Sequence, residues 1–233
     1  AGAALQSEFE AFGVHHHNLV KDGAHSGVVV VLVDPTGERT MFPDNGANSG
    51  LTLEDLPELH GFDAVYLSGY SPLDPSSRSG VLAMIKKIKG AGLRIYFDPA
   101  SVGGMKAVEK SEILDWLTHF DVLLLNEEEA EYLSGKSLHD EALDYLNSLV
   151  GTVVIKLGAS GAIAKNRNSK TEKVAAMTTH VVDTTGAGDA FAAGFISEFE
   201  ESGDLATSLA KASNVAAQCV AILGARPRVG TKI

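Results

Sequence analysis

Cysteine is almost absent from this chain of 233 residues, which has only Cys219. A single cysteine cannot form a disulfide within the chain, so we expect a protein of a reducing compartment, the cytoplasm. Cys219 falls in an apolar helical run and is predicted to be a core residue. Long apolar segments are absent as well: the longest, residues 27–33, has the length of a buried strand and is too short to span a bilayer.

Positive charge is scarce. Lys and Arg number 19 against 30 Asp and Glu, which gives a net charge of −11. Nucleic acids and anionic membrane surfaces bind to basic patches, so we expect neither as a partner. A nucleotide remains compatible, because it requires only a local positive potential. Hydrophobic residues make up 45% of the chain, and its length fits one domain, residues 1–233, with a sizeable core.

Short apolar runs alternate with helical patterns along most of the chain. The runs that we predict as strands are residues 64–68, 93–97, 122–125 and 153–155. Between them apolar residues recur at helical spacing, as in Val81, Leu82, Ile85 and Ile88. Alternating strands and helices predict a mostly parallel sheet covered by helices on both faces, which is a three-layer α/β/α fold.

The alternation breaks in the first fifth of the chain. Two strand-like runs, residues 27–33 and 39–42, flank the sequence Asp-Pro-Thr-Gly at 34–37. Asp-Pro-x-Gly is a tight-turn sequence, so we predict a β-hairpin at about residues 25–48.

Polar residues and glycines follow the predicted strands at their carboxyl ends. They are Gly69, Asp98, Asn126, Lys156 with Gly158, and Asp183. In open α/β sheets, ligands bind in the crevice beyond the carboxyl ends of the strands. The candidate functional residues therefore converge on one edge of the predicted sheet. Asp98, which is followed by a proline, is interpreted more simply as a structural turn acid.

The run 183–191, Asp-Thr-Thr-Gly-Ala-Gly-Asp-Ala-Phe, carries the strongest chemical signal. A strand-like segment, residues 179–182, precedes it, and a helical segment, residues 190–199, follows it. The glycines permit a sharp turn, and backbone amides at the start of a helix favour phosphate. Asp189 would repel a phosphate, unless it takes the proton of a hydroxyl that attacks the phosphate. The run indicates phosphoryl transfer from a nucleotide to an alcohol; the alternative is that Asp189 is an ordinary acid at a helix start.

This run resembles the signature of the ribokinase-like, or PfkB, carbohydrate kinases. Three other stretches resemble elements of that family in the same order and at similar spacing, over nearly all of the chain. They are Asn-Glu-Glu-Glu at 126–129, Lys-Leu-Gly-Ala-Ser-Gly-Ala at 156–162, and Gly-Glu-Arg-Thr at 37–40 followed by Gly-Ala-Asn at 46–48. The resemblance implies a ribokinase-like fold with a small β lid. It also implies an enzyme that uses ATP and Mg²⁺ to phosphorylate a hydroxymethyl group of a sugar.

The resemblance assigns roles to the residues of the glycine run. Asp189 would be the general base, and the amides of Gly186, Ala187 and Gly188 would form an anion hole for the phosphoryl group. Asp183 and Thr185 match positions that help to hold a potassium ion in some members, with a second contribution from a C-terminal loop, here residues 221–228. Asp183 could instead be a helix N-cap.

The other matched stretches would bind the nucleotide and its metal. Asn126 and Glu129 would organise Mg²⁺ and the phosphates through water, although acids also favour helix starts for structural reasons. Gly158 and Gly161 would let the nucleotide lie close to the backbone. Lys156 would contact the nucleotide, or would be an ordinary solvated lysine at a strand end.

The substrate-binding part of the family pattern is incomplete in this sequence. Residues 1–6 resemble the helix that follows the first strands of full-length relatives, so we expect those strands, which hold sugar hydroxyls, to be missing. The lid sequence favours a ribose-like sugar, and a lid of this kind often pairs with a second subunit, which implies a homodimer. The alternatives are a nucleoside kinase of the same family and a non-catalytic regulator that binds a nucleotide or a sugar.

Overall fold

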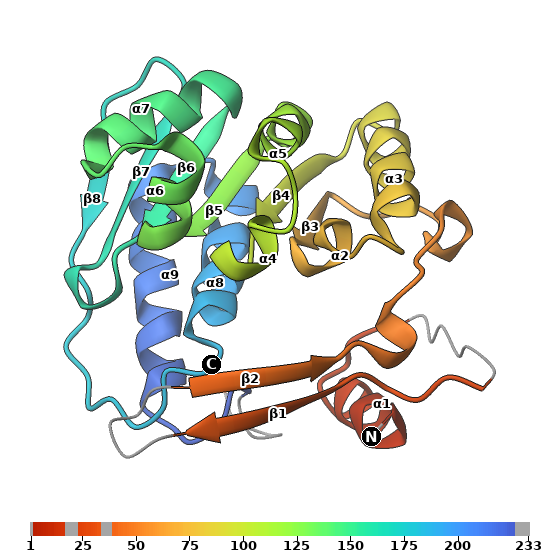
Figure 1. Ribbon diagram of the computed structural model, residues 1–233. Helices are drawn as coiled ribbons and strands as arrows, with labels where there is room; N and C mark the ends of the chain where they lie inside the picture. The colour runs from red at the N-terminus through yellow and green to blue at the C-terminus, as the bar shows by residue number, and fades with distance from the viewer. Residues whose placement is uncertain (1, 17–22, 34–38, 227–233) are drawn as a thin grey trace.

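The computed structural model describes residues 2–16, 23–33 and 39–226 (Figure 1). Its centre is a six-stranded sheet in the order β3-β4-β5-β6-β7-β8. The strands are β3 Ala64–Ser68, β4 Arg94–Asp98, β5 Val122–Asn126, β6 Thr152–Lys156, β7 Ala162–Asn166 and β8 Glu172–Val174. The first four are parallel, and β7 and β8 are antiparallel to their neighbours.

Helices cover both faces of the sheet, so the predicted three-layer fold is confirmed. The helices are α2 Tyr70–Leu73, α3 Arg78–Gly90, α4 Val102–Met105, α5 Lys110–Leu117, α6 Glu127–Ser134, α7 His139–Leu149, α8 Ala187–Ser202 and α9 Leu205–Val220. Figure 1 shows α8 and α9 together on one face and α3, α5, α6 and α7 on the other.

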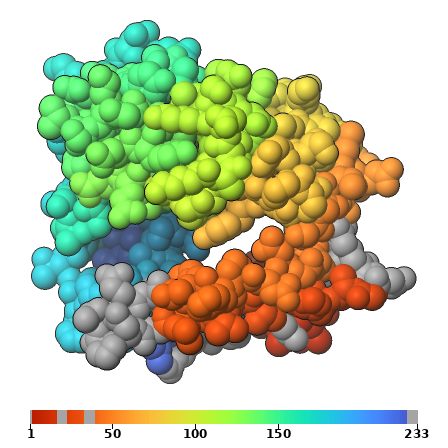
Figure 2. Space-filling model, viewed as in Figure 1, coloured from red at the N-terminus to blue at the C-terminus, as the bar shows by residue number. Residues whose placement is uncertain are grey.

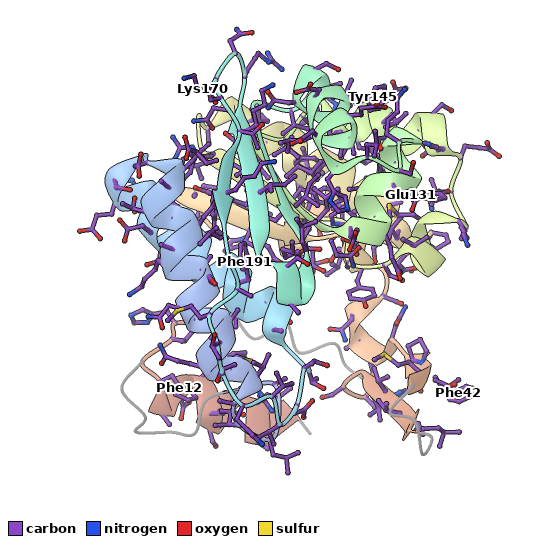
Figure 3. The ribbon with its side chains drawn as sticks, turned by 90° about the vertical axis from the view of Figure 1, so that its left-hand side faces the viewer. Phe12, Phe42, Glu131, Tyr145, Lys170 and Phe191 are labelled. Carbon is purple, nitrogen blue, oxygen red and sulfur yellow. The ribbon has the colours of Figure 1, made fainter. Side chains whose placement is uncertain are left out.

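Each face of the sheet has its own hydrophobic core. On β5, Leu123 and Leu125 belong to the cluster under α3, α5, α6 and α7, and Val122 and Leu124 belong to the cluster under α8 and α9. Phe191 of α8 packs into the second cluster (Figure 3). Because successive side chains point to opposite faces and both faces are covered, these strands appear in the sequence as continuous apolar runs.

The predicted strands at 64–68, 93–97, 122–125 and 153–155 are present, with ends that differ by at most one residue. The strand expected at residues 179–182 is wrong. That segment has no regular structure: Val181 and Val182 are 57% and 50% exposed, and Val182 N–H donates to the carbonyl oxygen of Val220 at the end of α9. None of the strands in the described residues pairs with it, so its β-branched residues do not decide its conformation.

Helices α8 and α9 approach each other closely. A Cβ atom on Gly194 of α8 would lie 2.9 Å from the Cα of Ala212 and 3.1 Å from the side chain of Val215, both on α9. Only glycine fits at this crossing without a shift of the helices, because two non-bonded carbon atoms do not approach to 2.9 Å, the distance from this Cβ to the Cα of Ala212. No helix in the described part of the chain combines the length and hydropathy that a bilayer span requires.

A two-stranded antiparallel hairpin, β1 Val28–Val33 and β2 Arg39–Asp44, stands apart from the sheet (Figure 1). It confirms the predicted hairpin strands, whereas the turn sequence at 34–37 lies outside the described residues. Helix α1 Gly2–Ala11 flanks it, and the short 3₁₀ helices η1 Gly46–Asn48 and η2 Leu53–Asp55 lead from it into β3. Figure 2 shows a hollow between this hairpin and the rest of the molecule.

The hairpin is apolar on its exposed surface. Val30 and Phe42 are register partners, and they are 56% and 55% exposed. Phe42 stands out from the hairpin in Figure 3. Similar exposure holds for its neighbours Val28, Val29, Val31, Leu32 and Met41.

Candidate active site

The carboxyl ends of β4, β5 and β6 bring together two predicted site residues, Asn126 and Lys156, and Asp98, which was predicted as a turn acid. Ser68 of β3 is level with Asp98 of β4, and Asn126 of β5 is level with Lys156 of β6. The Lys156 ammonium lies 2.6 Å from Asp98 Oδ2, and the two side chains are only 15% and 10% exposed. The predicted convergence of polar residues on this edge is therefore present for Asp98, Asn126 and Lys156.

Asp98 is held in a constrained turn. Its Oδ1 accepts the Ala100 N–H at 2.9 Å, and Ala100 has a φ of +68°, a left-handed conformation that is costly for residues with a Cβ. The Gly69 N–H donates to the carbonyl oxygen of Asp98 at 2.7 Å. A Cβ on Gly69 would lie 2.3 Å from the carbonyl oxygen of Pro99, so this close approach requires glycine.

The glycine run forms the start of α8. Gly186 is the N-cap, with φ of +79°, and the helix begins at Ala187, three residues earlier than the sequence predicted. Gly188 and Asp189 therefore lie in the first turn, where backbone N–H groups have no partner inside the helix. The Ala187 N–H already donates to the carbonyl oxygen of Thr184 at 3.2 Å.

The Lys156 side chain reaches this helix start. A Cβ on Gly188 would lie 3.6 Å from Lys156 Nζ, so the ammonium occupies the space beside this glycine. An anion at the first turn of α8 would therefore meet both helix amides and a cation.

Asp189 lies beside the same charged groups. Partial burial raises the pKa of its carboxyl above the ordinary value, the charge of Asp98 raises it further, and the Lys156 ammonium opposes both effects. Although the residue as a whole is exposed, part of its carboxyl is desolvated by the surrounding protein. A carboxylate with a raised pKa in a polar crevice has the properties of a general base.

Asn126 and Glu129 form a capping box at the start of α6. Glu129 Oε2 accepts the Asn126 N–H, and Asn126 Oδ1 accepts the Glu129 N–H, both at 2.8 Å. Glu129 is 2% exposed, and burial raises the pKa of its carboxyl above the ordinary value. The structural alternative is thus realised, and it leaves one Glu129 oxygen outside the capping box. Within the described residues, no three His, Cys, Asp or Glu side chains are arranged to hold a metal.

The turn between β6 and β7 depends on two glycines. It passes through a short 3₁₀ helix, η3 Gly158–Ser160, and both Gly158 and Gly161 have positive φ, +54° and +97°. A Cβ on Gly158 would meet open space, so the backbone there is accessible. A cavity of about 370 Å³ borders Ser160 on the side of α7.

Asp183 and Thr185 come together with the C-terminal loop. Asp183 Oδ1 accepts the Thr185 N–H at 2.9 Å and its hydroxyl at 2.7 Å, and Oδ2 accepts the Gly224 N–H at 3.0 Å. Asp183 is not a helix N-cap, since Gly186 occupies that position. A Cβ on Gly186 would lie 2.6 Å from the carbonyl oxygen of Ala225, so the loop packs against the glycine run. Residues 227 and 228 of the expected loop lie outside the described residues.

Cys219 is not a core residue, contrary to the prediction. It is partly exposed, and its Sγ lies 3.6 Å from the carbonyl oxygen of Thr185. It lies in the last turn of α9, which ends at Val220.

Sequence reasoning missed the part that β3 and α2 take in the site. Burial and the carboxylates of Asp98, Asp189 and Glu129 raise the pKa of Tyr66 and of Tyr70, so both phenols lie in the field of these acids. Each tyrosine is separated from Asp189 by more than a hundred residues, and no local motif marks such a neighbour. The available signal was the position of Tyr70 directly after Gly69 at a strand end.

Comparison with known proteins identifies the family. The sequence profile of the pfkB family carbohydrate kinases matches residues 1–231. An uncharacterized sugar kinase of Archaeoglobus fulgidus is 28% identical over 97% of this chain and 88% of its own length. A fructokinase of Vibrio alginolyticus is 28% identical over 84% of this chain and 66% of its own length, so the chain spans about two thirds of that relative.

Solved structures show the same fold. Adenosine kinase from Sinorhizobium meliloti superposes with a TM-score of 0.89 at 24% identity, over 97% of this chain and 70% of that one. A fructokinase from Vibrio cholerae, solved with fructose, ADP and a calcium ion, has a TM-score of 0.81 at 24% identity, over 96% and 77%. These matches confirm the ribokinase-like fold and the resemblance carried by the four motifs. The chain belongs to the pfkB family of carbohydrate kinases.

Proposed function

We propose that this protein is an ATP-dependent kinase that transfers a phosphoryl group to a hydroxymethyl group of a sugar, with a ribose-like sugar as the first candidate. The observation that carries the proposal is the start of α8. There the Lys156 ammonium approaches Gly188, and Asp189 follows directly in the same turn. A cation and helix amides suit a phosphate, and a carboxylate with a raised pKa suits the hydroxyl that attacks it.

In the proposed reaction Asp189 accepts the proton of the substrate hydroxyl as its oxygen bonds to phosphorus. The amides of Gly186, Ala187 and Gly188 stabilise the charge on the moving phosphoryl group. The Ala187 amide would exchange its present partner, the Thr184 carbonyl, for a phosphate oxygen.

The same proposal gives the nucleotide and its metal their binding residues. Gly158 and Gly161 shape the turn beside which the nucleotide lies, and Lys156 contacts its phosphates. Mg²⁺ neutralises charge on the phosphates when it is bound. Asn126 and Glu129 offer the oxygen donors that this hard cation prefers, and they would hold it through water.

A potassium site is proposed at Asp183 and Thr185. The carboxylate of Asp183 ties Thr185 to the loop at Gly224, beside the glycine run, so an ion at that position would act on the anion hole. Phosphorylation rates in potassium, in sodium and in cation-depleted buffer test this. Equal rates in all three contradict it.

The hairpin is proposed to be a lid over the sugar and a surface for homodimer formation. Its exposed apolar strands and the hollow beside it support both roles (Figure 2). Light scattering checks the second role, and a monomer at micromolar concentration removes it.

Release of ADP from Mg·ATP across a panel of sugars, sugar phosphates and nucleosides tests the kinase function. We expect release that depends on one class of acceptor. Asp189→Ala should lower kcat by about a hundredfold or more, as for a lost general base. Asp204→Ala is the matched control, because Asp204 caps α9 by accepting the Thr207 N–H at 2.8 Å and lies outside the site.

The two variants separate catalysis from a structural role. If Asp189 is only an acid at a helix start, both variants lose a little stability and neither loses activity. Binding of ATP without release for any acceptor would favour the non-catalytic regulator. Acceptors of the nucleoside class form the second candidate, and the aromatic rings of Tyr66 and Tyr70 near Asp189 favour it, since such rings stack on bases.

A further inference from the structure

The ion pair between Asp98 and Lys156 is too well buried to be explained by stability. Its side chains are 10% and 15% exposed, and desolvation of two charges offsets most of their attraction. The chain contains a close counterpart, Asp121 and Lys89, in which one carboxylate oxygen also binds the ammonium and the other accepts a backbone N–H, from Ile95. That pair is 35% and 38% exposed and lies at the amino ends of the strands.

Asp98 is held rigidly in its place. Each of its carboxylate oxygens has one partner, the Ala100 N–H at 2.9 Å and the Lys156 ammonium at 2.6 Å. The turn that supplies the first partner requires Ala100 to adopt a left-handed φ of +68°. Strain of this kind persists where the surrounding structure enforces it, and it gathers at functional sites.

The ammonium that Asp98 holds faces reacting groups. Lys156 Nζ lies over Gly188, and its charge opposes the rise in pKa of both Asp189 and Glu129. Without Asp98, the ammonium would be drawn toward those two carboxylates, on whose pKa it already acts. An ion pair with Asp189 would reduce its ability to accept a proton.

We propose that Asp98 is a positioning residue that holds the Lys156 ammonium above the first turn of α8, within reach of the phosphoryl group that moves from ATP to the acceptor. The inference rests on the proposed kinase function and deepens it. An acceptor oxygen bonds to the γ-phosphorus, the bond from that phosphorus to the oxygen of ADP breaks, and the acceptor proton goes to Asp189. Lys156 remains protonated throughout, and Asp98 exchanges no proton.

Nucleotide binding gives a test that does not depend on the acceptor. Isothermal titration should show that Lys156→Met weakens a non-hydrolysable ATP analogue about tenfold more than ADP, because the contact is to the terminal phosphoryl group. Asp98→Asn should weaken the analogue selectively in the same way, and Lys156→Arg should restore part of the loss. Asp121→Asn, the matched control, should leave both affinities unchanged.

Turnover with the best acceptor gives the second readout. Lys156→Met should lower kcat about a hundredfold, as for the loss of one preorganised donor to the transition state. Asp98→Asn should lower kcat by about tenfold, with little change in the KM of the acceptor. If Asp98→Asn does not fold, Asp98→Glu, which keeps the charge but displaces the ammonium, carries the test with the same two readouts.

The pH profile tests whether the charges of the pair act on Asp189. The groups around Asp189 are the charged Asp98 and Lys156 together with Tyr66, Tyr70 and Cys219, whose pKa values are raised so that they stay neutral in acid. Asp98→Asn should therefore move the acidic limb of kcat/KM to lower pH, and Lys156→Met should move it to higher pH. If neither limb moves, the pair does not act on Asp189, and the close approach of the ammonium to the reacting groups is contradicted.

The outcomes distinguish this inference from the function on which it rests. Equal weakening of ADP and the ATP analogue in Asp98→Asn, with kcat unchanged, overturns the positioning role and leaves the kinase intact. If the wild-type chain binds neither nucleotide, the proposed function fails and the positioning role fails with it.

Discussion

A Cβ atom on Gly161 would lie 1.9 Å from the carbonyl oxygen of Val174. The turn that follows β6 therefore rests directly on the end of β8, with no space for a side chain between them. Gly158 also has a positive φ and begins the same turn, but a Cβ there would meet nothing within 4 Å. The two glycines of one motif thus have different physical reasons to be glycine.

This difference predicts unequal effects of alanine. Gly158→Ala should cost about 1–2 kcal/mol, the strain of a left-handed alanine. Gly161→Ala should cost about 3 kcal/mol or more, because the backbone of β8 must also move. Urea unfolding of the two variants measures these losses of stability. Equal losses would show that the end of β8 can shift at little cost.

Replacing Ala100 with glycine should increase the free energy of unfolding, the opposite of the two alanine substitutions. Ala100→Gly removes the strain of φ +68°, which exceeds the entropy that glycine adds to the unfolded chain, so we expect stability to rise by about 0.5 kcal/mol. The control is Ala210→Gly on the exposed side of α9, which should lose about 1 kcal/mol. A loss at both positions would show that the turn at Ala100 is not strained.

Glu129→Gln should separate stability from activity. Glutamine keeps the capping box but carries no charge, whereas burial raises the pKa of Glu129 in the folded chain. A raised carboxyl pKa means that stability falls as pH rises from the unfolded pKa through the folded one. The Tm of the variant should therefore exceed that of the wild type at pH 8 and equal it well below both pKa values. Its kinase activity at pH 8 should nevertheless decrease.

Asp189 predicts the acidic limit of activity. As the proposed base, Asp189 must be ionised to accept a proton, and its pKa is raised above the ordinary value, first by partial burial and then by the charge of Asp98. Activity should therefore rise with pH through a point above the ordinary aspartate value. The dependence of kcat/KM on pH measures it, and full activity down to pH 4 would contradict the raised pKa.

We predict that the protein dimerises through the hairpin and that a charged side chain placed on the hairpin prevents this. Val30→Asp places a carboxylate on the exposed apolar strand β1, opposite Phe42. We expect light scattering to show a dimer for the wild type and a monomer for the variant. Asp44→Ala, at the end of the hairpin where Asp44 pairs with His25, serves as the control and should remain dimeric. A monomeric wild-type protein would contradict dimer formation through the hairpin.

The parts of the fold that the sequence predicted are those with a strong local pattern. Strands β3 to β6 are short apolar runs between helices, and the glycine run identifies its own turn whatever surrounds it. Strands β7 and β8 have no such pattern, because Ala162–Asn166 and Glu172–Val174 mix small, charged and polar residues. They form by pairing with β6 and with each other, which a single sequence does not encode locally.

The site residues also fall into two groups, those within one local motif and those that only the fold brings together. Asp189 and the capping pair at Asn126 and Glu129 are each contained in a few consecutive residues. The ion pair of Asp98 with Lys156 joins residues 58 positions apart, and only the order of the strands brings them together. For that reason Asp98 was predicted as a simple turn acid.

The close crossing of α8 and α9 at Gly194 has a consequence for chemistry. Since no side chain separates the two backbones there, a change in the spacing of the two helices acts directly on α8, whose first turn carries Asp189. A methyl group at position 194 would push the two helices apart and would displace Asp189, the proposed general base, from its present position. The speed of phosphoryl transfer would then depend on the width of a helix contact that touches neither ATP nor sugar.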